Sequence, residues 1–191
     1  MARTREFDVD QAVGRAMDLF WRRGYAETSL QELLQELAIG SGSFYAAFGS
    51  KEELYLRCLD RYASLQAGDL EKAIDGATEI RPAVRRLLAS LIELDLADPT
   101  RGCLVVNAST QCGDQPSAAE RVTAAIRRVE SLLAGALEQA QARGEISSDK
   151  DARGLARFFT TFIQGIRVAG RARVGREFAE DALSVAMRAL D

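Results

Sequence analysis

Two helix-start signals that stand close together constrain the fold of this chain more than any other feature. Thr28 or Ser29 precedes a glutamine or a glutamate at the spacing of a capping box, and Ser50 repeats that spacing. Between the two signals Gly40 permits a turn, which leaves only residues 41–47 for a further helix. A helix that short is not stable by itself and must be held rigidly against its predecessor. This arrangement predicts a helix-turn-helix, whose second helix enters the major groove of DNA.

The remaining pattern predicts an all-α protein. Apolar residues recur at helical spacing almost throughout, and no segment alternates with a period of two residues. The first helix begins after Asp8 or Asp10 and ends at Gly24. The expected units are an N-terminal three-helix DNA-binding module with the helix-turn-helix, a connecting helix and a C-terminal helical domain, at residues 1–50, 51–75 and 76–191.

The composition excludes several classes of protein. The chain contains no histidine, which rules out catalysis by histidine and metal sites that contain it. Its three cysteines show neither metal-binding nor redox spacing, and their odd number argues against a disulfide framework. No stretch is long and apolar enough for a membrane span, and the N-terminus lacks a secretory signal. We therefore expect a cytoplasmic protein without metal, cofactor or membrane partner, and not an enzyme.

The charge balance does not by itself predict binding to nucleic acid. Residues 1–55 carry six Arg or Lys and nine Asp or Glu, a balance equal to the net charge of −3 of the whole chain. A general basic patch is therefore missing. The hypothesis of DNA binding depends on the local geometry of the helix-turn-helix.

Three segments near the N-terminus form a recognisable pattern. They are AMDLFWRRG at residues 16–24, TSL at 28–30 and GSFYAAFGSKEEL at 42–54. With this pattern and an all-helical remainder, the sequence resembles the tetracycline-repressor (TetR) family, closely so over roughly residues 10–60. The segment RGCLVVN at 101–107 also looks like part of the ligand domain of some family members.

The resemblance implies a homodimeric transcriptional regulator, usually a repressor. Such proteins bind a palindromic operator in double-stranded DNA through the helix-turn-helix, here at about residues 28–47. A small-molecule effector, of unknown identity for this chain, binds the C-terminal domain and releases the protein from the operator. The resemblance also implies dimerisation through the last two long helices.

Residues of the short helix and its flanks are the candidates for contact with DNA. The pattern of the family implies that Thr28, Tyr45 and Lys51 contact the phosphate backbone, through two hydroxyls and one cation. Small residues at the start of the short helix allow a close approach, and their backbone N–H groups can meet a phosphate. Arginines before the first helix can reach phosphates or the minor groove as an N-terminal arm. The candidate DNA-binding residues are Arg3, Arg5, Thr28, Gly40, Ser41, Gly42, Ser43, Tyr45 and Lys51.

Four further residues of the short helix have other expected roles. Phe44 and Phe48 are expected to anchor the helix in the core rather than to contact bases. Ala46 and Ala47 depart from the family, in which many members carry larger polar or aromatic residues there. Alanine offers only an apolar contact to a thymine methyl group, so direct readout would fall on the two serines of the helix, with DNA shape adding specificity.

Aromatic and polar residues of the C-terminal domain are candidates for an effector site. Phe158 and Phe162 either line a pocket or fill the core, because apolar residues at helical spacing usually pack. Asn107 and Gln164 would orient a mostly apolar ligand if they faced a cavity.

Cys103 is a further candidate in this domain. It lies near the start of a helix predicted over Gly102–Thr110, which Asp98 or Thr100 would cap, and close to Arg101. A helix start and a neighbouring cation both favour the reactive thiolate. We therefore predict that Cys103 senses electrophiles or oxidants, with burial as a small apolar side chain as the alternative.

Two other functions remain open at this point. One is a helical module that binds small molecules or proteins and no longer recognises an operator. The acidic N-terminal balance, Ala46 and Ala47 support that alternative. The other is an enzyme with Cys103 as nucleophile, which would lack a histidine to act as its base.

Overall fold

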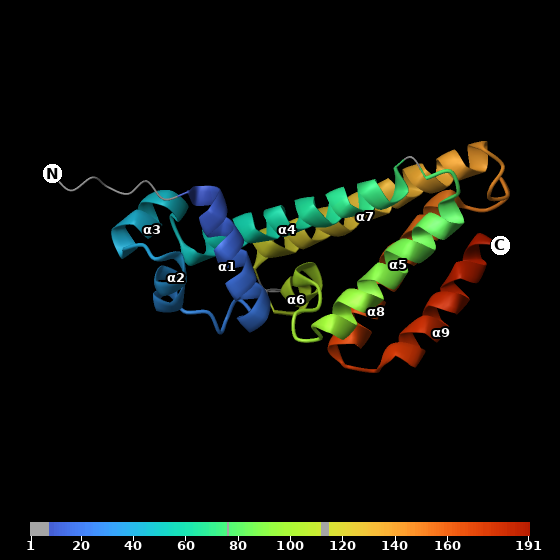
Figure 1. The fold of residues 1–191 in the computed structure, drawn as a ribbon. Helices are drawn as coiled ribbons and strands as arrows, with labels where there is room; N and C mark the ends of the chain where they lie inside the picture. Colours follow the sequence, from blue (N-terminus) through green and yellow to red (C-terminus); the bar gives the residue numbers. More distant parts are fainter. Residues whose placement is uncertain (1–7, 76, 112–114) are drawn as a thin grey trace.

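The computed structural model describes residues 8–75, 77–111 and 115–191, and every regular element within these ranges is helical. The molecule is elongated, with α1, α2 and α3 at one end and α5, α8 and α9 toward the other (Figure 1). No helix among the described residues is both long and apolar enough to cross a bilayer. The predicted all-α fold is confirmed. The helices are α1 Val9–Arg23, α2 Leu30–Leu37, α3 Ser41–Phe48, α4 Lys51–Ile74, α5 Ile80–Ala97, α6 Leu104–Gln111, α7 Pro116–Ala142, α8 Ala152–Arg171 and α9 Arg176–Met187, followed by a short 3₁₀-helix at Arg188–Leu190.

The first helix begins and ends at residues suited to capping. The carboxylate of Asp8 accepts the backbone N–H groups of Asp10 and Gln11 at 2.9 and 3.1 Å. At the other end Gly24 has a φ of +90°, a region that favours glycine. Its N–H donates to the carbonyl oxygen of Phe20 at 2.7 Å. The predicted bounds of this helix are confirmed.

Ser29, rather than Thr28, caps α2. The Ser29 hydroxyl accepts the backbone N–H of Glu32 at 3.2 Å, and the Glu32 carboxylate accepts the Ser29 N–H at 2.8 Å. The chain then turns at Ala38, which has a φ of +55°. The predicted turn is present, but its left-handed residue is Ala38, because Gly40 has a φ of −76° and caps the start of α3. A non-glycine residue in the left-handed region carries a conformational cost.

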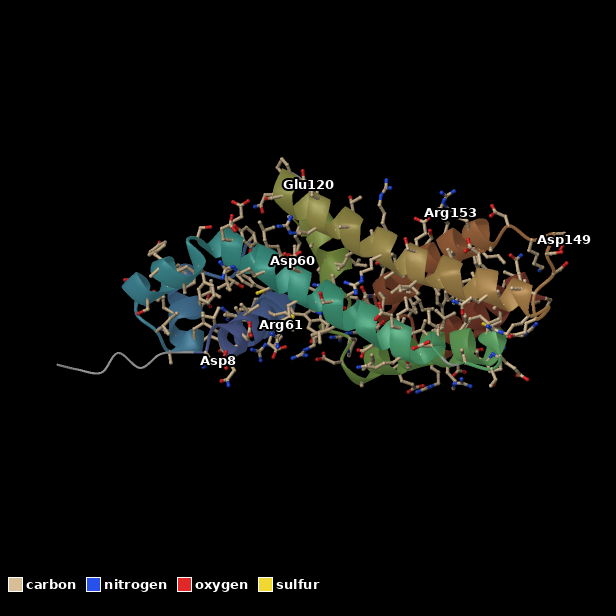
Figure 2. All side chains as sticks on the ribbon, turned by 90° about the horizontal axis from the view of Figure 1, so that it is seen from above. Asp8, Asp60, Arg61, Glu120, Asp149 and Arg153 are labelled. Atoms are coloured by element: carbon tan, nitrogen blue, oxygen red, sulfur yellow. The ribbon has the colours of Figure 1, made fainter. Side chains whose placement is uncertain are left out.

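α4 and α7 run side by side along the molecule and connect its two ends (Figure 1). Ser50 caps α4 through its hydroxyl, as predicted. Neighbouring residues of α4 serve different contacts (Figure 2). The Asp60 carboxylate pairs with Arg121 of α7 at 3.0 Å, whereas the Arg61 guanidinium lies against Gly14 of α1. α4 is therefore in contact with both the N-terminal module and α7.

The buried apolar side chains form two clusters. The first combines α1, α2, α3, the first part of α4, α6 and the start of α7. The second combines the end of α4 with α5, α8, α9 and the rest of α7. Buried residues between 103 and 125 therefore pack with the N-terminal module, although they follow it at a distance in the sequence. The division at residues 50 and 75 stays a prediction.

The segment before α6 is a loop. The helix predicted over Gly102–Thr110 begins at Leu104 instead, and Asp98 does not cap it. The Asp98 carboxylate closes a local turn, because it accepts the N–H and the hydroxyl of Thr100 at 3.1 and 2.5 Å. Gly102 has a φ of +60°. Residues 98–103 therefore change direction sharply between α5 and α6, and they are called the 98–103 loop below.

Candidate nucleic-acid interface

The short helix α3 is held in place by two phenylalanines. Phe44 and Phe48 are buried, and their ring centroids are 5.4 Å apart. Both belong to the cluster that α1 and α4 also fill. The prediction that they anchor α3 in the core is confirmed. The opposite face of the helix is thereby left on the surface.

The outer face of α3 consists of small residues and one tyrosine. Gly40, Ser41, Gly42 and Ser43 are exposed, and Tyr45 is 52% exposed. A Cβ at Gly42 would meet no atom within 4 Å, so packing within the chain does not require glycine there. Glycine inside a helix costs about 0.5–1 kcal/mol relative to alanine. The small residues of this face therefore leave room for another surface to come close to α3.

Two cations at the start of α4 lie close to the helix-turn-helix. The Lys51 ammonium is 4.3 Å from the centroid of the Tyr25 ring, an interaction that orients the cation. The guanidinium of Arg57 is 5.6 Å from the centroid of Phe48, at the end of α3. Sequence reasoning selected Lys51 but missed Arg57, although both lie on the helix that follows the helix-turn-helix.

Thr28 does not present its hydroxyl to the surface. It is buried, and its Oγ1 donates to the carbonyl oxygen of Gly24 at 2.7 Å. A phosphate oxygen can only accept a hydrogen bond, and the proton of this hydroxyl is already in use. The prediction of a hydroxyl contact from Thr28 to the DNA backbone is therefore wrong. Thr28 fixes the connection between α1 and α2 instead.

The predicted N-terminal arm, with Arg3 and Arg5, lies outside the described residues. In the described part of the module, Arg15 and Arg23 both pair with glutamates of α2. These pairs are exposed and contribute little to stability, but they remove two cations from the set that could attract DNA.

A cavity of about 440 Å³ lies between the N-terminal module and the helices behind it. α1 contributes Met17 and Trp21, α4 contributes a row that includes Tyr62 and Gln66, and α5, α7 and α8 complete the wall. Burial raises the pKa of the Tyr62 hydroxyl well above its ordinary value, so this group stays neutral. The wall is mostly apolar, with Arg167 of α8 and Asp69 of α4 as its charged residues. A cavity of this size and composition suits a small, mostly apolar ligand.

Four predicted effector residues do not line this cavity. Asn107 is buried, and its amide is used locally, because it donates to a carbonyl of the 98–103 loop at 3.0 Å and accepts from Arg171. Phe158 is exposed on α8, while Phe162 and Gln164 are half-buried and absent from the cavity wall. These four residues were candidates for the effector site, and none of them lines this cavity.

Cys103 lies directly behind the cavity wall. It is buried, and its sulfur accepts a weak hydrogen bond from Gln66 at 4.0 Å. Tyr62 is also in contact with it. The cation predicted beside the thiol is engaged elsewhere, since the Arg101 guanidinium lies 5.0 Å from the centroid of Trp21 and pairs with two aspartates. Cys103 is therefore near the cavity but separated from it by two side chains.

The 98–103 loop connects the cavity with the N-terminal module. The indole N–H of Trp21 donates to the carbonyl oxygens of Arg101 and Gly102, at 3.0 and 3.2 Å. Arg167 donates to the same Gly102 oxygen at 2.5 Å. Trp21 and Arg167 both line the cavity. A ligand in the cavity would thus contact both side chains that hold this loop.

Sequence reasoning missed Trp21 and Arg167 as functional residues. Trp21 is the only tryptophan of the chain, and it follows the buried Phe20 at the edge of the apolar face of α1. Arg167 stands four residues after the buried Ile163, on the inward face of α8. A cation at helical spacing within an apolar stripe is the signal that could have identified Arg167.

Two family models match the chain. The model described as "Bacterial regulatory proteins, tetR family" matches residues 13–58, and "Tetracyclin repressor-like, C-terminal domain" matches residues 82–186. The chain belongs to the TetR family of bacterial regulatory proteins. This TetR-family protein is therefore a transcriptional regulator with a helix-turn-helix that binds operator DNA, and it is not an enzyme.

Individual relatives of this TetR-family protein agree with the assignment. The HTH-type transcriptional repressor ComR of Escherichia coli (strain K12) is 32% identical over 172 residues, which are 88% of this chain and 82% of ComR. A cysteine mutant of the TetR family transcriptional regulator CifR, complexed with 26-bp double-strand operator DNA, is 34% identical with a TM-score of 0.88, and the match covers 99% of this chain and 100% of CifR. Reduced E. coli NemR, at 22% identity, shares the fold, with a TM-score of 0.85 over 93% of this chain and 94% of its own.

Proposed function

We propose that this TetR-family protein is a homodimeric, ligand-responsive repressor that binds a palindromic operator through the outer face of α3. The observation that carries the proposal is the exposed small-residue face of α3, with Gly42 in a place where packing does not require glycine. Lys51 and Arg57 supply cations close to the helix-turn-helix. Phosphate contacts from these cations and from the Tyr45 hydroxyl position the helix, and base contacts from its two serines specify the sequence.

Exposed apolar side chains on the last two long helices support a dimer. Phe158 and Val168 on α8, and Phe178 and Val185 on α9, are between 43 and 57% exposed. Large apolar side chains gathered on the surface of a soluble protein commonly mark an interface. α8 and α9 lie away from α3 (Figure 1). A two-fold dimer through them would place two copies of α3 about one turn of DNA apart, or a multiple of it.

The cavity of about 440 Å³ is the proposed effector site. Its apolar wall fits a small, mostly apolar molecule that is oriented by a few polar groups. An occupant that displaces Trp21 or Arg167 changes the hydrogen bonds that both make to the 98–103 loop. Because Trp21 belongs to α1, this displacement changes the position of the module that carries α3. Effector and operator binding are then coupled, and each weakens the other.

Cys103 adds a chemical signal to the proposal. Its neighbours Tyr62 and Gln66 line the effector cavity, so that an electrophile in the cavity comes close to the thiol. We expect p-benzoquinone to abolish operator binding through Cys103. A Cys103→Ser variant that still loses operator binding with p-benzoquinone would refute this role. Cys58 is the matched control, because it is buried and burial raises the pKa of its thiol well above the ordinary value.

Binding to short palindromic duplexes, taken from the DNA that flanks the gene of this protein, tests the proposal. We expect specific binding that weakens as salt rises, with a modest slope because each subunit contacts few phosphates. A folded dimer that binds none of the duplexes specifically would contradict the proposal. That outcome would favour the alternative, a helical module that binds small molecules or proteins without recognising an operator.

A further inference from the structure

A second cavity lies next to a buried ion pair. The guanidinium of Arg167, which lines the effector cavity, pairs with the carboxylate of Asp95 at 2.9 Å. Asp95 lines a separate cavity of about 210 Å³, between the ends of α5 and α8 and the start of α9. The two charged side chains are only 6% and 4% exposed. The ion pair is therefore shared between the walls of both cavities.

The second cavity is apolar around one carboxylate oxygen. Ile92, Ile166 and Ala179 are among the side chains of its wall. One oxygen of Asp95 binds Arg167, whereas Oδ2 is buried and has no hydrogen-bond partner within the described residues. A buried acceptor without a partner costs free energy, and a ligand that donates a hydrogen bond would recover part of it.

Gly170 makes room for this carboxylate. A Cβ at position 170 would stand 2.6 Å from the Cβ of Asp95 and 2.7 Å from its Oδ2. Both distances are too short for two non-bonded atoms. Gly170 itself lines the same cavity. A larger residue would displace the carboxylate, so the glycine keeps Oδ2 at the cavity wall.

We propose that the 210 Å³ cavity is a second ligand site, which takes a small, mostly apolar alcohol. The hydroxyl of the ligand donates to Oδ2 of Asp95, and its apolar body fills the remainder of the cavity. Arg167 already balances the charge of Asp95, and Arg173 also lines the cavity, so a cationic ligand would add an unbalanced charge. An apolar cavity of roughly 150 Å³ can hold benzene, so this cavity has room for a ring with a short substituent.

This second site goes beyond the effector cavity, and its occupation does not require DNA binding. The two sites are nevertheless linked through Arg167, which pairs with Asp95 and donates to the carbonyl of Gly102. A ligand that changes the hydrogen bonding of Asp95 would change the hold of Arg167 on the 98–103 loop. We therefore expect the second ligand to modulate the response to the first.

Methyl NMR spectra of the full-length protein, labelled at the isoleucine δ1 positions, test the proposal with benzyl alcohol and toluene. Ile92 and Ile166 line the second cavity, whereas Ile163 lines the first. Burial raises the pKa of Asp95 to about 6, so the carboxylate is ionised at about pH 8. At that pH we expect benzyl alcohol to shift the signals of Ile92 and Ile166 at concentrations that leave Ile163 unchanged. Toluene, which lacks the donor, should bind at least about fivefold more weakly.

Two alanine-to-leucine variants assign the binding to one cavity. Ala179→Leu adds volume to the second cavity and Ala73→Leu adds volume to the first. Leucine is a good helix former, so both changes suit their helices. We expect Ala179→Leu to remove the shifts of Ile92 and Ile166, and Ala73→Leu to retain them. Equal affinity for both probes, no binding of benzyl alcohol, or loss of the shifts in Ala73→Leu alone would each overturn the proposal. The comparison of the two probes uses the unmodified protein and does not depend on either variant.

Discussion

Trp21 of α1 and Arg167 of α8 donate hydrogen bonds to the same carbonyl oxygen, that of Gly102, at 3.2 and 2.5 Å. Trp21 belongs to the module that carries α3, and Arg167 belongs to the C-terminal helices. Both side chains also line the cavity of about 440 Å³. One carbonyl of the 98–103 loop therefore joins the proposed effector site to the proposed DNA-binding end.

Replacement of Trp21 by phenylalanine removes this indole donor and keeps an aromatic ring beside Tyr62. We expect Trp21→Phe to lower the free energy of unfolding by about 1–3 kcal/mol, because the loop loses a hydrogen-bond donor and the core loses volume. Urea unfolding at a fixed protein concentration measures the change. Tyr45→Phe, which removes an exposed hydroxyl, should change the value by less than about 0.5 kcal/mol. Equal stability of the Trp21→Phe variant and the unmodified protein would contradict the role of this contact.

Gly42→Ala should separate stability from DNA binding. Because a Cβ at Gly42 meets no atom within 4 Å, we expect the variant to gain about 0.5–1 kcal/mol in free energy of unfolding. The added methyl group projects where we place the DNA, so affinity for the operator should fall. Gly68→Ala in α4, where a Cβ also meets nothing, is the control. The Gly68→Ala variant should gain similar stability and leave operator affinity unchanged. A Gly42→Ala variant that binds the operator as tightly as the unmodified protein would contradict a close approach of DNA to this face.

Lys51→Ala tests the proposed phosphate contact. The loss of one cation per subunit should weaken binding to all DNA sequences by a similar factor, and it should reduce the slope of log affinity against log salt by about 1 per site contacted. Titrations at several salt concentrations measure both effects. Lys72→Ala lies near the other end of α4, where the side chain is 80% exposed, and it serves as the control. An unchanged salt slope in Lys51→Ala would remove this residue from the DNA-binding set.

Asp95 gives the stability of the protein an unusual dependence on pH. Burial raises the pKa of its carboxyl to about 6, and the Arg167 guanidinium opposes that rise. The folded protein therefore keeps the proton to a higher pH than the unfolded chain, in which aspartate titrates at about 3.9. The stability that this group contributes is fully present below about pH 4 and is lost as the pH rises through about 6.

Comparison with Asp95→Asn isolates this contribution. We expect the free energy of unfolding of the unmodified protein, minus that of the variant, to fall by up to about 3 kcal/mol between about pH 4 and pH 7. Arg167 lacks its charged partner in the variant at every pH, so that effect is a constant offset. Chemical unfolding at a series of pH values provides the comparison. A difference that rises with pH would mean that Arg167 outweighs burial.

Local signals in the sequence predicted the N-terminal module well. Ser50 starts α4, Gly24 ends α1, and the two phenylalanines of α3 are in the core, because caps and apolar spacing depend on residues near one another. The left-handed Ala38 was not predicted, since the energetic preference for glycine there is small enough for tertiary packing to override. Thr28 and Ser29 both had capping-box spacing, and Ser29 caps α2 because the Thr28 hydroxyl is bonded to the carbonyl of Gly24.

Contacts between distant segments could not be predicted in this way. The hydrogen bond from Trp21 to Arg101 joins residues that are 80 positions apart, and the spacing of apolar residues does not predict it. Asn107 was a candidate to orient a ligand if it faced a cavity, yet its amide bonds to the 98–103 loop and to Arg171. Some polar residues face a cavity, and others form hydrogen bonds between neighbouring segments. The packing of α4, α5 and α8 decides which role each residue has. That packing follows from long-range geometry rather than from spacing along the chain.

The most direct measurement is the selection of bound duplexes from a random DNA library by the full-length protein, followed by sequencing. If α3 of a two-fold dimer reads DNA, the selected duplexes will share an inverted repeat whose half-site centres are separated by about one helical turn, roughly 10 base pairs, or a multiple of it. The Gly42→Ala variant should enrich the same repeat more weakly. A folded protein that enriches no sequence, or a single half-site without its inverted copy, would contradict operator recognition by a dimer through α3.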